Sequence, residues 1–253
     1  MRTEGRPSSP CPAGANPAAG GGDTSRNGGE TGATGTARGR GGCGATGADI
    51  VGVGAAVAAA RVLADRPGLA VLGIVGAPGA GKTTLAERIV AELGDPACLL
   101  PMDGFHLANA TLARLGRADR KGAPDTFDAA GYVATLRRIR AGGETVYAPR
   151  FHREVEESYA AELTVDPATT RLVVTEGNYL LLTEPPWSPV RGLLDACWYV
   201  TVDEALRRRR LVDRHRRYGR SPAAARAWAH GSDQRNADLI AATRPAADAV
   251  VRL

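Results

Sequence analysis

Gly76-Ala77-Pro78-Gly79-Ala80-Gly81-Lys82-Thr83-Thr84 is a complete G-x-x-x-x-G-K-[ST] phosphate loop. An apolar run over residues 69–75 leads into the loop and is typical of a buried parallel strand. Behind the loop, apolar side chains recur at helical spacing as far as Gly94, which can end a helix; they are Leu85, Ile89, Val90 and Leu93. Strand, loop and helix therefore follow one another in the order that a nucleotide-binding loop requires.

The residue types of the loop account for its chemistry. Glycines let the backbone curl with its N–H groups pointing inward, and the N-terminus of the following helix adds partial positive charge. The Lys82 side chain can then reach the β- and γ-phosphates, and the Thr83 hydroxyl can ligate Mg²⁺. All residues from Gly76 to Thr84 are therefore candidate ATP-binding residues.

The 253-residue chain is long enough for one α/β domain with a sizeable core. We assign this domain to residues 48–253, because residues 1–47 are rich in Gly and Ala and hold almost no large apolar side chain. Such a segment cannot bury enough surface to offset its ordering entropy, so we expect residues 1–47 to be a disordered tail.

The sequence also argues against several classes of protein. The tail has no apolar h-region of a secretory signal, and no later segment approaches the ~20 apolar residues of a membrane span. The four cysteines form no C-x-x-C pair, so neither a zinc site nor a disulfide framework is indicated. We therefore expect a cytoplasmic protein with no membrane partner.

The net charge of +5 comes mostly from one segment, residues 207–226, which is dense in arginine and has Asp213 as its one acid. Such a run could be a nucleic-acid patch, a solvated helix face or a lid that grips phosphate. No aromatic-interleaved pattern or nucleic-acid motif accompanies it. We therefore expect no nucleic-acid partner, and favour an arginine-rich lid.

Two carboxylates follow expected strands. Asp103 comes after an apolar run over residues 97–102, and Glu176 after another over residues 171–175. Because ligands collect beyond the carboxyl ends of parallel strands, Asp103 is placed to accept a hydroxyl proton and Glu176 to hold Mg²⁺. The alternative for Asp103 is a turn-initiating residue, and for Glu176 an N-cap or turn residue.

The remaining pattern predicts an α/β fold in which a parallel sheet is flanked by helices. Five strands are expected, over residues 69–75, 97–102, 171–175, 196–202 and 247–251, with one helix over 129–141. Residues 144–147 and 162–165 predict a short β excursion around a charged loop, 148–153. Ser221 and Pro222 are typical of the N-cap and first residue of a helix.

Lys121 attracts attention because it and Lys82 are the only lysines among 32 basic residues. The chain takes arginine wherever charge alone is needed, and the planar arginine head cannot replace a compact ammonium at a tight phosphate site. Lys121 is therefore a candidate functional residue, the alternative being a residue of no special role.

An ordered set of motifs gives these features a family resemblance. The segments are GAPGAGKTT (76–84), PMDGFH (101–106), RKGAPDTFD (120–128), YAPRFHREVEE (147–157), VVTEGNYLLL (173–182) and RRRRLVDRHRRYG (207–219). Together they resemble the uridine kinase, phosphoribulokinase and pantothenate kinase superfamily over about residues 50–253. The closest resemblance is to its nucleoside/nucleotide kinase-like branch.

The resemblance implies roles for individual residues. The catalytic base of the family falls on Asp103, the carboxylate of its E-G motif on Glu176, and its lid arginines on Arg210 and Arg214. Lys82, Asp103 and Arg214 would then be catalytic, and Thr83 and Glu176 would hold Mg²⁺. The stretch from Arg120 to Pro124 resembles the acceptor-side segment of bacterial pantothenate kinases.

His106, Lys121, Arg150 and His152 are candidate acceptor-binding residues. The alternative for His106, Arg150 and His152 is a solvent-facing loop position. His152 also marks a departure from the family, because relatives often have an Asp in the P-x-F-D-R motif where this chain has His152. This difference puts the identity of the acceptor in doubt.

The favoured function is an ATP-dependent kinase that phosphorylates a hydroxyl of a small metabolite, with Mg²⁺ as cofactor. Pantothenate, a nucleoside, a free sugar and a sugar phosphate all stay open as acceptors, and the chain could form a homodimer. A P-loop ATPase that acts as a switch or assembly factor is the alternative. A GTPase is disfavoured because no [NT]-K-x-D motif follows the fourth strand.

Overall fold

The computed structural model describes residues 48–253, and the tail predicted over residues 1–47 lies outside them. The described chain forms a six-stranded sheet in which all neighbouring strands are parallel. Its order is β1-β8-β7-β2-β6-β3, with β1 Ala48–Val51, β2 Ala70–Val75, β3 Ala97–Pro101, β6 Leu172–Gly177, β7 Ala196–Thr201 and β8 Ala249–Arg252. The α/β class predicted from the sequence is confirmed.

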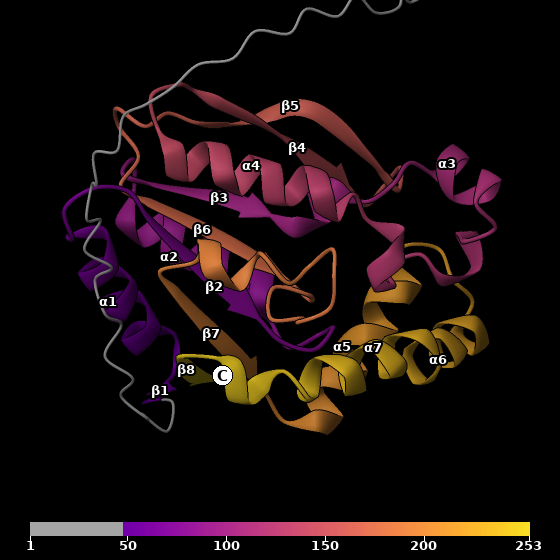
Figure 1. The fold of residues 1–253 in the computed structure, drawn as a ribbon. Coiled ribbons are helices and arrows are strands. Elements are labelled where there is room, and N and C mark those ends of the chain that lie inside the picture. The colour runs from indigo at the N-terminus through magenta and orange to yellow at the C-terminus, as the bar shows by residue number, and fades with distance from the viewer. Residues whose placement is uncertain (1–47) are drawn as a thin grey trace, which may run out of the picture. The chain divides into compact units, whose positions relative to one another are not determined.

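Helices and a hairpin cover the two faces of this sheet (Figure 1). Along β2, Val71 and Val75 enter a core with α4, while Leu72 and Ile74 enter a second core with α1 and α2. A strand buried on both faces has to be apolar throughout, which explains its unbroken apolar run. The helices are α1 Val53–Ala64, α2 Lys82–Leu93, α3 Asn109–Arg114, α4 Ala129–Ala141, α5 Glu204–Arg217, α6 Pro222–His230 and α7 Ser232–Ala241.

Several helix ends lie where the sequence predicts them. α2 ends before Gly94, whose φ of 73° suits a residue without a Cβ. The Ser221 side chain accepts a hydrogen bond from the Ala224 N–H, and Pro222 is the first residue of α6. α4 spans the predicted residues 129–141 and is capped by the Asp128 carboxylate.

Two expectations about strands are wrong. The sheet has six strands rather than five, because the four-residue β1 pairs with β8 at the sheet edge. The charged segment 148–153 is not a loop for most of its length. It belongs to β4 Val146–His152, which pairs with β5 Glu157–Val165 in an antiparallel hairpin. Cross-strand pairing compensates for its weak strand pattern.

The parallel arrangement brings distant segments to one edge. The phosphate loop follows β2, Asp103 follows β3, and Glu176 lies in β6 opposite Ile74 and Pro101. Figure 1 shows α5, α6 and α7 gathered beyond the arrowheads of the strands. This edge is therefore where a ligand site is expected.

Within residues 48–253, every helix is too short or too polar to cross a bilayer.

We expect Gly104→Ala to destabilise the protein, because a Cβ at Gly104 would lie 2.2 Å from the carbonyl oxygen of Pro149 in β4. Backbone would have to shift, at a cost of about 1–3 kcal/mol. Thermal unfolding measures this as a Tm lowered by several degrees. Gly192→Ala is the control, since its Cβ would meet nothing within 4 Å. Equal Tm values for the two variants would contradict the close approach of Gly104 to β4.

Candidate active site

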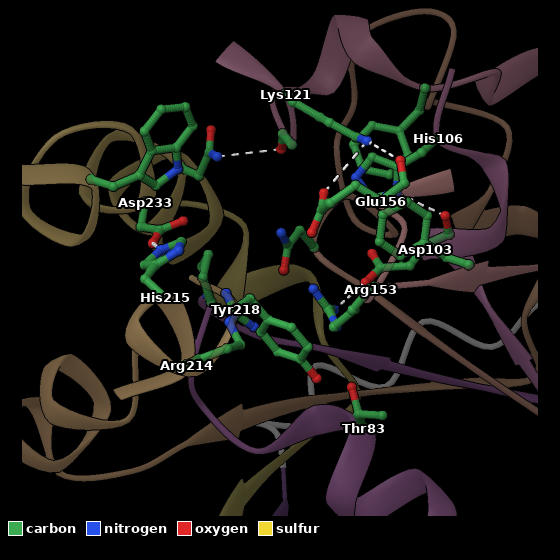
Figure 2. Close-up of a pocket in the computed structure, with 18 of the residues that line it drawn as sticks. Thr83, Asp103, His106, Lys121, Arg153, Glu156, Arg214, His215, Tyr218 and Asp233 are labelled. Carbon is green, nitrogen blue, oxygen red and sulfur yellow. Dashed lines mark hydrogen bonds and ion pairs between the residues drawn. The ribbon is translucent and has the colours of Figure 1, made fainter. Parts of the chain in front are cut away.

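A cavity of about 420 Å³ lies at the carboxyl edge of the sheet (Figure 2). Its lining runs from the phosphate loop and α2, across the ends of β3 and β6, to the hairpin turn and α5 and α6. Eight of the predicted site residues share this lining: Pro78, Lys82, Thr83, Asp103, His106, Lys121, Glu176 and Arg214. The phosphate loop and Asp103, the carboxylate expected to act on the acceptor, therefore face the same cavity.

Lys82 is the first residue of α2, and its side chain folds back over the phosphate loop. Its Nζ donates to the carbonyl oxygens of Gly76 (2.9 Å) and Ala77 (3.3 Å), and to Oδ1 of Asn178 (2.8 Å). Burial lowers the pKa of Lys82 to about 8, although Glu176 and Asp103 oppose this shift. Lys82 is thus an ammonium held by neutral oxygens, which can turn its charge toward a phosphate.

Thr83 and Glu176 provide adjacent oxygen atoms. The Thr83 hydroxyl donates to Oε1 of Glu176 at 2.9 Å, and Glu176 is buried in β6. Burial raises the pKa of the Glu176 carboxyl, as does the nearby Asp103, while Lys82 and the Thr83 hydrogen bond oppose this. A hydroxyl and a carboxylate, completed by phosphate oxygens and water, are a donor set that Mg²⁺ accepts. The residues present therefore fit a magnesium ion.

Asp103 lies in a single 3-10 turn, Met102–Phe105, directly after β3. Its Oδ2 accepts a hydrogen bond from Arg153 Nη2 at 2.6 Å (Figure 2). Burial alone would raise the pKa of Asp103, but Arg153, His106, Lys82 and Arg214 together hold it below its ordinary value. The carboxyl is therefore ionised and can accept a hydrogen bond from a hydroxyl group.

Arg153 is a site residue that the sequence reasoning missed. It follows β4 by one position and lies 50 residues from Asp103 in the chain. Its guanidinium also lies 5.8 Å from the centre of the Phe151 ring. The one sequence signal for Arg153 was its position next to His152, in the motif where this chain differs from the family. Nothing local in the sequence indicates the contact of Arg153 with Asp103.

Lys121 lies in the wall of the cavity. Its Nζ donates to Oδ1 of Asn109 (2.7 Å) and to the carbonyl oxygen of Glu156 (2.5 Å), and lies 3.4 Å from the Glu156 carboxylate. Asn109 Nδ2 also donates to the Glu156 carbonyl at 3.0 Å. Lys121 therefore ties the segment after α3 to the turn of the β4–β5 hairpin, and no sequence pattern indicates its partners Asn109 and Glu156.

Arg150 and His152 do not line this cavity. They line a second hollow of about 380 Å³, which also reaches Asp103 and Arg153. Both side chains pair with Glu162 on β5, at 3.5 Å for Arg150 and 2.6 Å for His152. The structure thus separates these two predicted acceptor contacts from His106 and Lys121, because β4 is a strand whose cross-strand neighbour holds them.

The helix that carries the arginines packs on the phosphate loop itself. A Cβ at Gly79 would lie 2.9 Å from the carbonyl oxygen of Arg207, and one at Gly81 would lie 3.6 Å from Nη1 of Arg210. Arg207 is buried and donates to the Pro78 carbonyl at 3.0 Å, so it serves the packing. Arg214, one turn after Arg210, lines the cavity, and burial lowers its pKa.

The last helices add side chains that the sequence reasoning did not single out. His215 on α5 contacts Asp233 on α7 at 2.6 Å, and the Arg220 guanidinium lies 3.9 Å from the centre of the Trp228 ring. All four residues line the cavity. They come from three helices and the link between α5 and α6, so their gathering could be found only from the tertiary structure.

Comparisons with known proteins agree with this geometry. No protein-family model matches the chain. The "ATP-dependent kinase-like protein notR'" of Aspergillus versicolor is 37% identical over 153 residues, which cover 56% of this chain and 88% of that protein. The "Putative uridine kinase C227.14" of Schizosaccharomyces pombe is 33% identical over 157 residues, covering 57% of this chain and 65% of that protein.

A solved structure is similar over most of the described chain. The protein described as a "putative fructose transport system kinase" from Silicibacter sp. TM1040 superposes with a TM-score of 0.70 at 35% identity. The match covers 80% of this chain and 98% of that chain.

Proposed function

Because the chain belongs to the uridine kinase, phosphoribulokinase and pantothenate kinase family of P-loop kinases, we propose that it transfers the γ-phosphate of ATP to a hydroxyl of a small metabolite. One observation carries the proposal. Lys82, the Thr83–Glu176 pair and Asp103 face a single cavity, so a phosphate donor and a hydroxyl acceptor could meet there.

On the donor side, residues 76–84 bind the phosphates through backbone N–H groups and the Lys82 ammonium. Thr83 and Glu176 hold Mg²⁺, which supplies positive charge to the phosphate oxygens when bound. Arg210 and Arg214 approach the phosphates from α5. The proximity of this helix to the loop supports that role.

On the acceptor side, Asp103 orients the hydroxyl and accepts its proton. The acceptor oxygen forms a bond to the γ-phosphorus, and the bond from that phosphorus to the bridging oxygen of ADP breaks. Arg153 keeps the Asp103 carboxylate ionised and aimed, as the 2.6 Å contact supports. His106 and Lys121 form the wall beside the acceptor. Arg150 and His152 line the neighbouring hollow, which Asp103 also lines, so they would contact an acceptor that extends into that hollow.

The protein must also keep water from the γ-phosphate. We infer that the α5–α6 segment, residues 207–226, acts as an arginine-rich lid that closes when both substrates are bound. Arg214 on α5 and Arg220 after it both line the cavity, which supports a lid that contributes charge as it closes.

The alternative, a P-loop ATPase switch, makes a different prediction. A kinase should release little ADP until its acceptor is present, and acceptor should stimulate release by about 10²-fold or more, because it replaces poorly positioned water. The measurement is ADP release with Mg²⁺ and ATP against a panel of hydroxyl-bearing metabolites. Rapid ADP release that no acceptor changes would favour the switch.

A further inference from the structure

The cations around the cavity fall into two groups. On the donor side, Lys82 contacts carbonyl and amide oxygens, and neither Lys82 nor Arg214 forms an ion pair with any residue in 48–253. These are therefore cations whose charge is available to the phosphates of ATP.

On the acceptor side, two of the cations that line the cavity are already paired with carboxylates. Arg153 pairs with Asp103 at 2.6 Å, and Lys121 pairs with Glu156 at 3.4 Å. The same holds in the neighbouring hollow, where Arg150 and His152 share the carboxylate of Glu162. Arg220 is exposed and lies over the Trp228 ring, so it keeps its charge but lies outside these ion pairs.

This pairing bears on the charge of the acceptor. A carboxylate or phosphate on the acceptor would face Asp103 and Glu156, whose counter-cations are already engaged, and Glu176, which forms no ion pair within residues 48–253, so repulsion would oppose its binding. A neutral hydroxyl has no such difficulty. It can donate to a carboxylate and accept from an ammonium, and so joins an ion pair without breaking it.

We propose that the acceptor is an uncharged compound with several hydroxyl groups, of the free-sugar or nucleoside type. Its hydroxyls would form hydrogen bonds with the Lys121–Glu156 pair. The inference rests on the proposed kinase function and narrows its substrate class. It excludes sugar phosphates and sugar acids as preferred acceptors, and it makes Lys121 and Glu156 specificity-determining residues.

The first test compares acceptors that differ only in charge. Suitable sets are ribose with ribose 5-phosphate, glucose with glucose 6-phosphate and gluconate, and uridine with uridine monophosphate, assayed for ATP-dependent phosphorylation by the full-length protein. We expect an uncharged member to be phosphorylated with kcat/KM at least about 10²-fold above its anionic partner. Preference for an anionic member, or no phosphorylation of any uncharged member, overturns the inference. Phosphorylation of an anionic acceptor leaves the kinase function intact, whereas rapid hydrolysis independent of every acceptor overturns both.

The second test is Glu156→Gln, which removes the negative charge and keeps the shape, leaving Lys121 unpaired. We expect kcat/KM for the uncharged acceptor to fall and that for its anionic partner to rise, so that their ratio changes at least about ten-fold, with KM for ATP unchanged. Glu144→Gln is the matched control, since Glu144 pairs with Arg138 at 2.9 Å and lines neither hollow. Equal Tm values establish that both variants fold. An unchanged ratio in Glu156→Gln overturns the role of the pair.

Discussion

Replacing Lys82 with alanine is expected to lower ATP turnover by about 10²–10³-fold, the usual scale for losing one preorganised charge at a developing anion. The ammonium is buried, and its three acceptors belong to the phosphate loop and Asn178, so its charge is aimed at the loop rather than at the core. The fold should survive, because the side chain ends in the cavity and water can replace it there.

Lys82→Arg should fail to restore turnover. Three oxygen atoms lie within 3.3 Å of one nitrogen, a cradle that fits a compact ammonium and not a planar guanidinium. Arg88→Ala is the control on the same helix, because Arg88 is exposed and its one ion pair within residues 48–253 is with Glu92. Steady-state turnover and nucleotide affinity measure the effect. Parental turnover in Lys82→Arg would contradict the role assigned to the loop lysine.

The phosphate loop could be predicted from the sequence because all its parts are local. Strand β2, the loop and α2 are consecutive in the chain, so the position of Lys82 follows once the strand and helix are recognised. Predicting that Asp103 and Glu176 share a site needed one further step of inference. They come from different strands, but parallel strands end at one edge, which brought both into the same cavity.

The acceptor side could not be predicted in the same way, since its contacts join segments far apart in the chain. Arg153 reaches Asp103 across 50 residues, and Lys121 reaches Glu156 across 35. These contacts depend on the register of the β4–β5 hairpin, which shifts between Ala148 and Arg150. No local pattern encodes such a shift, and an error of one residue turns each side chain to the other face.

Lys121 is the exception, and composition rather than periodicity pointed to it. A chain that uses arginine for nearly all its positive charge kept a lysine where Nζ lies close to two oxygens, Asn109 Oδ1 and the Glu156 carbonyl. A branched guanidinium would not fit between them without displacing one. Composition could suggest that Lys121 matters, but only the structure gives it a partner and therefore a testable role.

Asp103→Asn is expected to reduce acceptor-stimulated turnover by about 10²-fold or more, the usual scale for losing a general base, while ATP·Mg²⁺ affinity changes only a few-fold. The substitution is nearly isosteric, and the amide oxygen of asparagine can still accept the hydrogen bond from Arg153. A loss of packing therefore cannot explain the loss of turnover. Asp119→Asn serves as control, because Asp119 is an exposed carboxylate whose one ion pair in the described part of the chain is with Arg120, at 3.7 Å.

The confounding explanation is that Asp103 serves the metal instead. Its carboxylate is close enough to raise the pKa of Glu176, the proposed Mg²⁺ ligand. Titration with Mg²⁺ separates the two roles, because loss of a metal ligand is partly recovered at high Mg²⁺ and loss of a base is not. If Asp103→Asn transferred phosphate at the parental rate, the kinase would lose its catalytic carboxylate and the ATPase switch would become the better assignment. If its activity recovered as Mg²⁺ rose, Asp103 would belong with Thr83 and Glu176 on the donor side, and the acceptor hydroxyl would need another base.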